Sequence, residues 1–337
     1  MIPGPSTGYE MVDRVLSRSL KKRLPFYTAR WRRRYRAMID EIAARIGKLT
    51  FGRDGDVPWI EERDSGVRIF GFWTEPKNHE VYDLLRDAWP RALPESHFRL
   101  MKDYLTRYVY PHMRPDLRPV GYSVDQMWGF HGQHKDTIGD QPNVSDRERL
   151  TAAFQPRADD VIVDGGAFVG MGDLRMSRDL TAGRIVAIEA SRGCYDLLCR
   201  NISYNKIDNV LAFNRALWHS RGTLDLEVGF AQANTLVAEV AKGERRQAIE
   251  TVSIDDLVDE LGLARVTMLS LTLNGAEVET LDGAGKTLTH MRPRIRLAGW
   301  YTRSGIPIWK ITKEKLERHG YEVFVGPRGN VMALPRP

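Results

Sequence analysis

The segment from Asp159 to Ser191, DDVIVDGGAFVGMGDLRMSRDLTAGRIVAIEAS, carries residues suited to binding a nucleoside. Glycines at 165, 166 and 170 follow the acidic Asp164, and such glycines let bare backbone N–H groups approach a ligand at a helix N-terminus. Glu189 ends the next apolar run, where its carboxylate can accept hydrogen bonds from the two hydroxyls of a ribose. The two strands and the glycine turn therefore predict a nucleoside site.

The detail of the turn distinguishes between nucleoside cofactors. A dinucleotide fingerprint, G-x-G-x-x-G, has its second glycine where the backbone meets pyrophosphate, and Ala167 stands at that position here. This substitution argues against NAD and leaves a nucleotide-dependent dehydrogenase as a distant alternative. The non-functional alternative is that the glycines merely allow a tight crossover from strand to helix.

Three later segments extend the pattern. They are ASRGCYDLLCRNISYNKIDNVLAFNRALW after Glu189, then ETVSIDDLVDELGL, and then VTMLSLTLNGAEVETLDGA. Their order and spacing resemble the FkbM-like family of S-adenosylmethionine-dependent methyltransferases, from near Leu150 to the C-terminus. The resemblance implies methyl transfer from S-adenosylmethionine, usually to a hydroxyl group.

The resemblance also implies a set of cofactor-binding residues. Those of the turn would surround the methionine end of the cofactor, while Glu189 would bind the ribose and Ala216 the adenine. With two neighbours, the expected set is Asp164, Gly165, Gly166, Ala167, Gly170, Glu189, Ala190 and Ala216.

The fourth strand departs from the family pattern. Members usually carry Lys-x-Asp-x-Glu-Gly-Ala-Glu, whereas this chain has the neutral residues Ser270, Thr272 and Asn274 before Gly275. The change fits variation within a working family, a different substrate class, or a domain that binds cofactor without catalysis. It also removes the carboxylates that a hard metal ion prefers, so we expect no metal site.

Methyl transfer requires alignment of the methyl group with its acceptor, exclusion of water and, for an alcohol, a proton acceptor. Thr272 and Asn274 can orient a hydroxyl group but cannot act as bases near neutral pH. The candidates for the base are His131, His134, Glu277 and Tyr301. The two histidines are expected in a loop, where solvated side chains, a general base and a metal ligand all remain possible.

Alternating apolar segments predict an α/β fold, a Rossmann-like seven-stranded methyltransferase sheet with helices on both faces. Strands are expected at 160–164, 185–189, 210–216, 266–273, 294–300, 321–325 and 330–334, with the last pair antiparallel. Helices are expected at 192–205, 253–261, 275–288 and 311–319, with a further helix leading into the first strand. An inserted strand or hairpin is expected at 223–228, returning at 249–252.

The N-terminal half is expected to be an extension of this domain. We divide the chain into a mostly helical basic extension (1–48), a mixed cap region (49–121), a loop region (122–149) and the methyltransferase domain (150–337). Aromatic residues in the cap region could line a substrate cavity, although such residues are more often core.

Charge is unevenly distributed along the chain. Residues 14–36 hold ten Lys or Arg and no acid, and the formal net charge of the whole chain is +6. Two amphipathic helices here could pack on the catalytic domain, or contact an anionic membrane surface or a protein partner through residues 11–46. The N-terminus lacks a signal pattern and no apolar run is long enough to span a membrane, so we expect a cytoplasmic protein. Membrane contact through residues 11–46 would make it peripheral to the membrane.

The sequence thus predicts O-methylation of a hydroxyl group on a small molecule, sugar or glycan. A non-catalytic cofactor-binding or scaffold protein is the alternative, because of the neutral fourth-strand motif. Nucleic acid is not an expected partner, since the basic residues could neutralise phosphates but no base-reading motif accompanies them.

Overall fold

The computed structural model describes residues 49–55, 57–63, 66–70, 143–228, 235–237, 246–326 and 329–337. Nearly all of these belong to one compact unit, Thr50–Pro337. The basic block, residues 71–121 of the expected cap region, and both candidate histidines lie outside the described residues. The domain boundaries proposed above stay predictions. Among the described residues, no helix is both long and apolar enough to cross a membrane.

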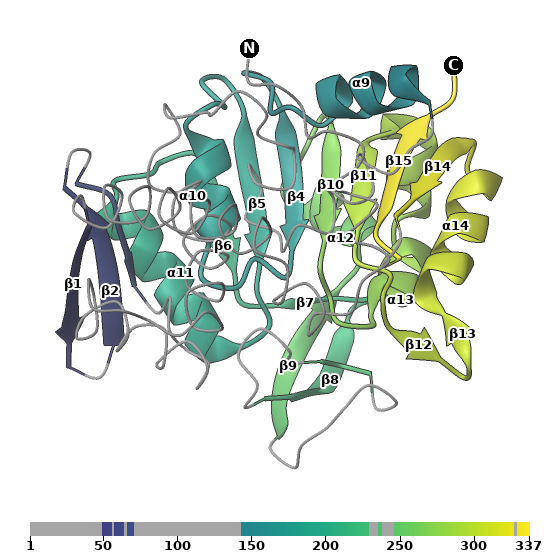
Figure 1. Ribbon diagram of the computed structural model, residues 1–337. Helices are drawn as coiled ribbons and strands as arrows, with labels where there is room; N and C mark the ends of the chain where they lie inside the picture. The colour runs from purple at the N-terminus through teal and green to yellow at the C-terminus, as the bar shows by residue number, and fades with distance from the viewer. Residues whose placement is uncertain are drawn as a thin grey trace, which may run out of the picture. The chain divides into compact units, whose positions relative to one another are not determined.

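A seven-stranded sheet, in the order β14-β15-β11-β10-β4-β5-β6, forms the centre of the unit (Figure 1). The strands are β4 (Val161–Gly165), β5 (Arg184–Ile188), β6 (Val210–Phe213), β10 (Met268–Leu271), β11 (Arg294–Leu297), β14 (Tyr321–Val325) and β15 (Val331–Pro335). The β11, β10, β4, β5 and β6 strands pair in parallel, whereas β15 is antiparallel to both β11 and β14. The expected sheet, including its antiparallel last pair, is confirmed.

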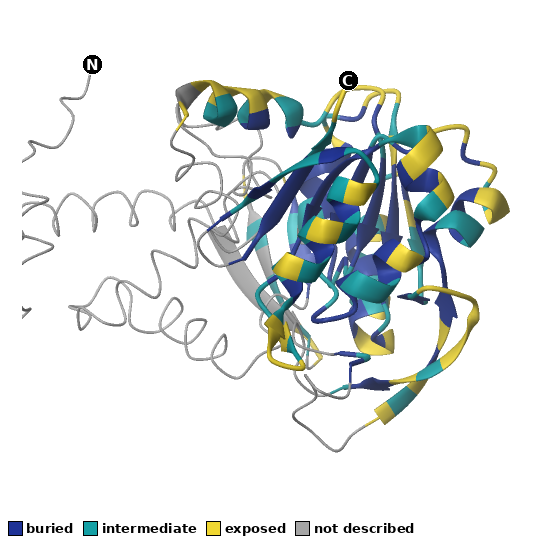
Figure 2. Cartoon of the chain, turned by 90° about the vertical axis from the view of Figure 1, so that its right-hand side faces the viewer, coloured by how far each residue is buried: buried dark blue, intermediate teal, exposed yellow. Residues whose placement is uncertain are grey.

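Helices cover both faces of this sheet. On one face pack α9 (Val144–Ala153), α10 (Met171–Ser177) and α11 (Arg192–Tyr204). On the other pack α12 (Ile254–Glu260), α13 (Glu277–Asp282), the π-helical turn η4 (Thr287–Met291) and α14 (Ile308–Arg318). Buried residues concentrate in the central strands, and the exposed residues lie on the outer sides of the helices (Figure 2). This layering explains why the parallel strands are mainly apolar.

Three smaller sheets accompany the central one. The β7 (Ala216–Leu217), β8 (Gly222–Glu227) and β9 (Arg246–Val252) strands form one, which extends past the carboxyl ends of the central strands in Figure 1. The hairpin β12 (Thr302–Arg303) and β13 (Ile306–Pro307) forms the second. The third is β1 (Leu49–Asp54), β2 (Val57–Glu62) and β3 (Arg68–Phe70). The inserted strand and its return were expected, whereas β12 and β13 were missed.

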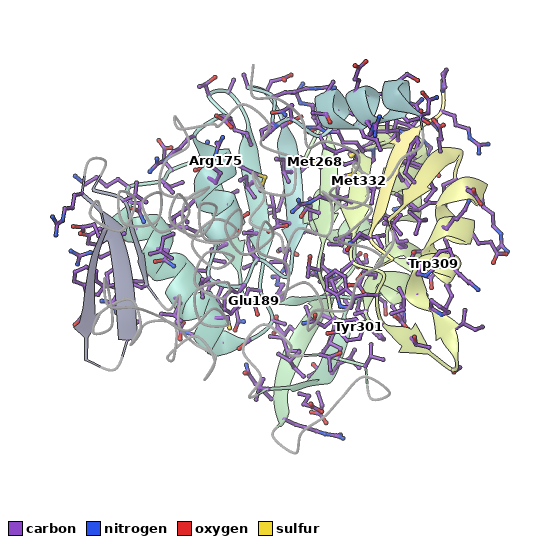
Figure 3. All side chains as sticks on the ribbon, viewed as in Figure 1. Arg175, Glu189, Met268, Tyr301, Trp309 and Met332 are labelled. Atoms are coloured by element: carbon purple, nitrogen blue, oxygen red, sulfur yellow. The ribbon has the colours of Figure 1, made fainter. Side chains whose placement is uncertain are left out.

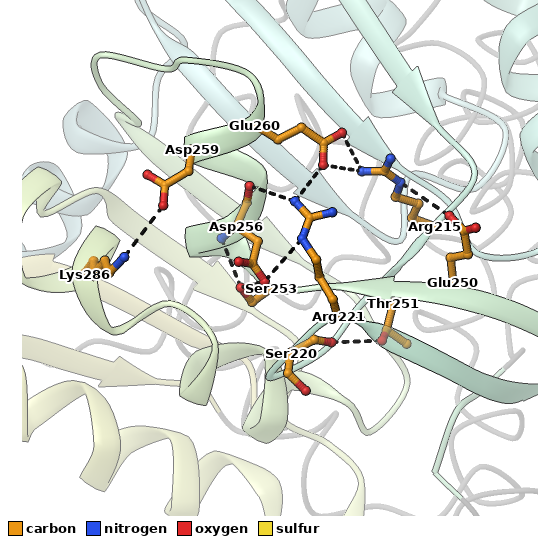
Figure 4. Close-up of polar contacts among 10 residues, drawn as sticks. All are labelled: Arg215, Ser220, Arg221, Glu250, Thr251, Ser253, Asp256, Asp259, Glu260 and Lys286. Atoms are coloured by element: carbon orange, nitrogen blue, oxygen red, sulfur yellow. Dashed lines mark hydrogen bonds and ion pairs between the residues drawn. The ribbon is translucent and has the colours of Figure 1, made fainter.

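Local polar groups fix the ends of several helices. The Ser253 side chain accepts from the backbone N–H of Asp256 at 3.0 Å and donates to its carboxylate, which begins α12. Glu260 at the other end of α12 accepts from Arg215 and Arg221, each at 2.8 Å (Figure 4). These arginines tie the chain that enters and leaves β7 to α12.

Two expected elements differ in the structure. The helix expected at 275–288 ends at Asp282, because the carbonyl of Gly283 accepts from the backbone N–H of Asp255 and the Asp255 side chain caps the next turn at Thr287. The strand expected at 210–216 splits after Phe213, since the Asn214 side chain donates to the carbonyls of Glu189 and Ala190 at 2.9 and 3.0 Å. Side-chain capping overrides the apolar pattern in both places.

A buried ion pair joins the sheet to the loop before β4. Arg294 Nη1 donates to Asp160 Oδ1 at 3.0 Å, and Nη2 donates to Oδ2. Their side chains are 6% and 1% exposed. Burial opposes ionisation of Asp160, but hydrogen bonds and charge from Arg294 outweigh it and hold the pKa of the carboxyl below its ordinary value.

We predict that Arg294→Met lowers the free energy of unfolding by about 3–5 kcal/mol, because it leaves a buried carboxylate without its partner. Part of this difference in unfolding free energy between the variant and the wild type should disappear at acidic pH. The lowered pKa means that the pair stabilises the protein above the ordinary value of 3.8 and loses this effect as the pH falls through the folded-state pKa. Urea unfolding at several pH values measures both effects. Arg265→Ala, in an exposed pair with Asp159, is the control and should change little. Equal losses in the two variants would contradict the assignment.

Candidate functional site

The glycine turn joins β4 to α10 and folds back onto β5. The N–H groups of Gly166 and Ala167 both donate to the carbonyl of Ile188, at 2.9 and 3.1 Å, and that of Gly170 donates to Ala167. The N–H of Phe168 donates to Glu189 Oε2 at 2.8 Å. The expectation that bare N–H groups of this turn face a ligand is therefore wrong for these four residues. The end of β5 satisfies the first three N–H groups, and the turn itself satisfies that of Gly170.

Two glycines of the turn are required by their conformation and surroundings. Gly166 has a φ of 80°, and a Cβ atom there would lie 2.1 Å from the carbonyl oxygen of Thr272. Gly170, with a φ of 81°, precedes α10 and would place a Cβ atom 2.4 Å from Leu198. Only glycine adopts this backbone without strain and leaves this space.

Glu189 stands at the end of β5, directly beside the turn. Its Oε2 accepts from Phe168 and its Oε1 from the backbone N–H of Ser191, both at 2.8 Å. The residue is 8% exposed. Burial raises the pKa of this carboxyl to about 7, against the lowering effect of the two hydrogen bonds. Because each carboxylate oxygen has two acceptor positions, the group can still accept from a ligand's hydroxyls.

Two of the expected cofactor residues, Ala190 and Ala216, lie close to each other. Half-buried Ala190 packs against a small apolar cluster of Ala216, Leu226 and Ile249, which joins β7 to the β8–β9 hairpin. Ala216 itself is 3% exposed. The structure thus brings Ala190, Ala216 and Glu189 together at one end of the sheet.

Below the turn, a row of polar residues crosses the centre of the sheet. Asp164, Ser270 and Arg296 occupy matching positions on β4, β10 and β11, and Arg296 donates to Ser270 Oγ through Nε and Nη2 at 3.2 and 3.0 Å. Asp173 of α10, which is fully buried, faces Asp164. Sequence analysis missed Asp173 and Arg296, although two arginines in the buried strand RIRL were a signal.

The carboxyl end of β10 carries the other candidates. Tyr301 donates through its hydroxyl to Asn274 Oδ1 at 3.2 Å, and Thr235 donates to the Asn274 carbonyl at 2.7 Å. Asn274 has a φ of 51°, a conformation that asparagine tolerates. Figure 3 shows Tyr301 and Glu189 near the same edge of the sheet, away from Met268 and Met332. The candidate acceptor residues and the candidate cofactor residues therefore share one edge.

These contacts define what each candidate can do. Burial raises the pKa of Tyr301, so at neutral pH it is a hydrogen-bond donor and not a base. Glu277 accepts from the N–H groups of Leu273 and Gly275, at 2.8 and 2.9 Å, and so holds the turn after β10. The buried Oγ1 of Thr272 has no hydrogen-bond partner among the described residues. In the part of the chain that the structure describes, no cluster of His, Cys, Asp or Glu could hold a metal ion.

Part of this chain is similar to known methyltransferases. Residues 164–326 match the family model "Methyltransferase FkbM domain". The chain is 31% identical over 153 residues to the methyltransferase sdnD of Sordaria araneosa, an alignment that covers 36% of this chain and 59% of that protein. The chain therefore spans about three fifths of the length of this curated relative.

Solved structures are also similar to this chain. A methyltransferase FkbM from Methylobacillus flagellatus has a TM-score of 0.41 and 14% identity, covering 75% of this chain and 60% of that one. Fibrillarin from Aeropyrum pernix, solved with natively bound S-adenosyl-L-methionine, has a TM-score of 0.33 and 12% identity, covering 53% and 68%.

The turn geometry yields a prediction for two glycines. Gly166→Ala should lower the free energy of unfolding by about 2–4 kcal/mol, because it adds strain and a backbone clash. Gly193→Ala is the control, since its Cβ atom meets nothing within 4 Å and α11 should gain about 0.5–1 kcal/mol. Denaturant unfolding measures both variants, and a Gly166 variant as stable as the wild type would contradict the described turn.

Proposed function

We propose that this protein transfers the methyl group of S-adenosylmethionine to a hydroxyl group, because residues 164–326 match the model of the methyltransferase FkbM domain. This match supports the cofactor expected from the sequence. The acceptor class is a small molecule, sugar or glycan, and the argument for it comes from the residues at the carboxyl ends of β10 and β11.

The position of Glu189 beside a turn whose N–H groups are already bonded carries this proposal. A dinucleotide needs free N–H groups for its pyrophosphate, whereas here the N–H groups of residues 166, 167, 168 and 170 all bond to protein. A nucleoside without phosphate needs a carboxylate for its ribose and an apolar surface for its base. Glu189 and the cluster around Ala190 and Ala216 supply these two features.

When bound, S-adenosylmethionine supplies a methyl group that is already activated on a sulfonium, so the chain has mainly to bind and orient. The polar groups at the acceptor edge are Thr272, Asn274 and Tyr301, all neutral at pH 7. They can exchange hydrogen bonds with a neutral hydroxyl group and offer no charge to an ionic acceptor. Proton removal remains a proposed role for His131 or His134, or for water.

The neutral positions 272 and 274 also favour a second candidate, a protein that binds the cofactor without catalysis. The two candidates share the cofactor site and differ only in turnover. Binding and turnover are therefore tested separately.

The first prediction from this proposed function concerns cofactor binding. Calorimetry should show binding of S-adenosylmethionine and S-adenosylhomocysteine and none of NAD. Glu189→Gln should weaken this binding by about 2–3 kcal/mol, because charge-assisted hydrogen bonds to ribose are lost. Because hydroxyl groups favour the ionised carboxylate, the wild-type affinity should fall as the pH drops below about 7, and the Gln variant should lose this dependence. NAD binding without a response to the methionine nucleosides would end the proposal.

The second prediction concerns turnover. With a panel of sugars, polyols, phenols and amines, label from the methyl group should enter a hydroxylated acceptor as an ether stable to base. Tyr301→Phe should raise the acceptor KM several-fold at unchanged cofactor affinity, because the variant removes one hydrogen-bonding hydroxyl. Activity should be insensitive to EDTA, since Thr272 and Asn274 offer no carboxylate to a hard ion.

Label in amines alone would refute O-methylation. Cofactor binding without turnover on any acceptor would favour the non-catalytic candidate, and EDTA-sensitive activity restored by a divalent ion would point to metal ligands at His131 and His134.

A further inference from the structure

Two asparagines on α11 hold strand β3 through its backbone. Asn201 Oδ1 accepts from the N–H of Phe70 at 2.7 Å, and its Nδ2 donates to the Phe70 carbonyl at 3.1 Å. Asn205 does the same for Arg68, with distances of 3.1 and 2.7 Å. The residues are four apart, so both side chains leave the same side of the helix. Among the described residues, β3 is an edge strand that pairs with β2 on one side only. On its other side, the two side-chain amides take the place of a neighbouring strand.

Aromatic and charged contacts fix β3 in the same place. The Arg68 guanidinium lies 3.8 Å from the ring centre of Trp59 and 4.8 Å from that of Tyr204 on α11. Arg200 of α11 lies 3.8 Å from the ring centre of Phe70, a residue that is 2% exposed. Stacked guanidinium groups and a buried ring make docking of β3 on α11 favourable.

Asn201 has a further contact that Asn205 lacks. Its Nδ2 also donates to the carbonyl oxygen of Val169 at 2.8 Å. Val169 directly precedes Gly170, whose left-handed conformation begins α10. Asn205 instead donates its second bond to the Asn201 carbonyl, within its own helix. One side chain therefore connects β3, α11 and the glycine turn.

Strand β3 determines which way the Asn201 amide faces. The residue is fully buried, and its oxygen must face the only donor among these three backbone groups, the N–H of Phe70. This leaves the NH₂ group directed at the carbonyls of Phe70 and Val169. Without β3 the amide oxygen loses its donor, the Phe70 N–H, and the NH₂ group loses one of its two acceptors, the Phe70 carbonyl, so the bond to Val169 is no longer oriented.

We propose that Asn201 is a positioning residue for the cofactor turn, and that docked β3 acts through it as a remote part of the cofactor site. The proposal rests on the function proposed above, in which this turn binds S-adenosylmethionine. Through Val169 the amide fixes the turn that precedes α10, next to the carbonyl of Ile188 and the carboxylate of Glu189.

The test compares Asn201→Asp with Asn205→Asp in the full chain. Each change replaces an NH₂ group that donates to one β3 carbonyl and to one other carbonyl, and Asn201→Asp should lose more stability because Asn201 is fully buried whereas Asn205 is half-buried. Only the first loses the bond to Val169. We expect the Kd for S-adenosylmethionine to rise roughly tenfold in Asn201→Asp and to stay within about twofold of the wild type in Asn205→Asp. Thermal unfolding of both variants provides the stability comparison.

Equal changes in Kd for the two variants, or none in either, would overturn the proposal. If Asn201→Asp fails to fold, Asn201→Ser is compared with Asn205→Ser: it removes the accepted bond as well as the two donated bonds, adds no charge, and carries the same expectation. Wild-type protein gives an independent readout: because coupling is reciprocal, cofactor binding should slow hydrogen exchange at the Phe70 amide more than at the Arg68 amide. Exchange at Phe70 that the cofactor leaves unchanged would also overturn the proposal. A wild type that does not bind S-adenosylmethionine would instead refute the proposed function.

Discussion

The return of the glycine turn onto the end of β5 is the constraint on which the site depends. One carbonyl, that of Ile188, accepts from two N–H groups of the turn, and the neighbouring Glu189 side chain accepts from a third. Buried backbone donors must find partners, and here the second strand of the sheet supplies them. The carboxylate that we propose binds ribose therefore also holds the turn. Binding and local folding share one residue, which is why its loss should affect both.

Below the turn, the sheet tolerates a buried cluster of ionisable groups because their charges offset each other. Asp164 and Asp173 face one guanidinium, that of Arg296, so the three groups would carry a net negative charge if both acids ionised. Burial raises the pKa of Asp164, and burial together with the Asp164 charge raises that of Asp173 well above its ordinary value. Asp173 therefore favours its protonated form, and the cluster is close to neutral beneath the cofactor turn.

The sequence predicted much of the fold because apolar runs and turns alternate clearly in the second half of the chain. All seven central strands and the Glu189 strand end follow from that pattern. Hydrogen bonds from side chains to backbone far away in the sequence do not follow from this pattern. Examples are Asn214, which ends β6, Asp255, which caps the turn after α13, and Asn201, which holds β3. The same limit applies to the site. Glycines and an acid predicted the nucleoside pocket, but nothing local indicated that Glu277 would hold the turn after β10 by accepting from Leu273 and Gly275.

The asparagine clamp on β3 also bears on the order in which the molecule is assembled. Phe70 and Asn201 are 131 residues apart, whereas the β4, α10 and β5 segments that form the turn are neighbours in sequence. Closing the longer loop costs more chain entropy, so the local β–α units should form first. During synthesis β3 leaves the ribosome well before α11 has been made. Until that helix forms, the β3 backbone groups that Asn201 and Asn205 later bind remain bonded to water. The cofactor turn would then reach its final shape only at the last step of folding.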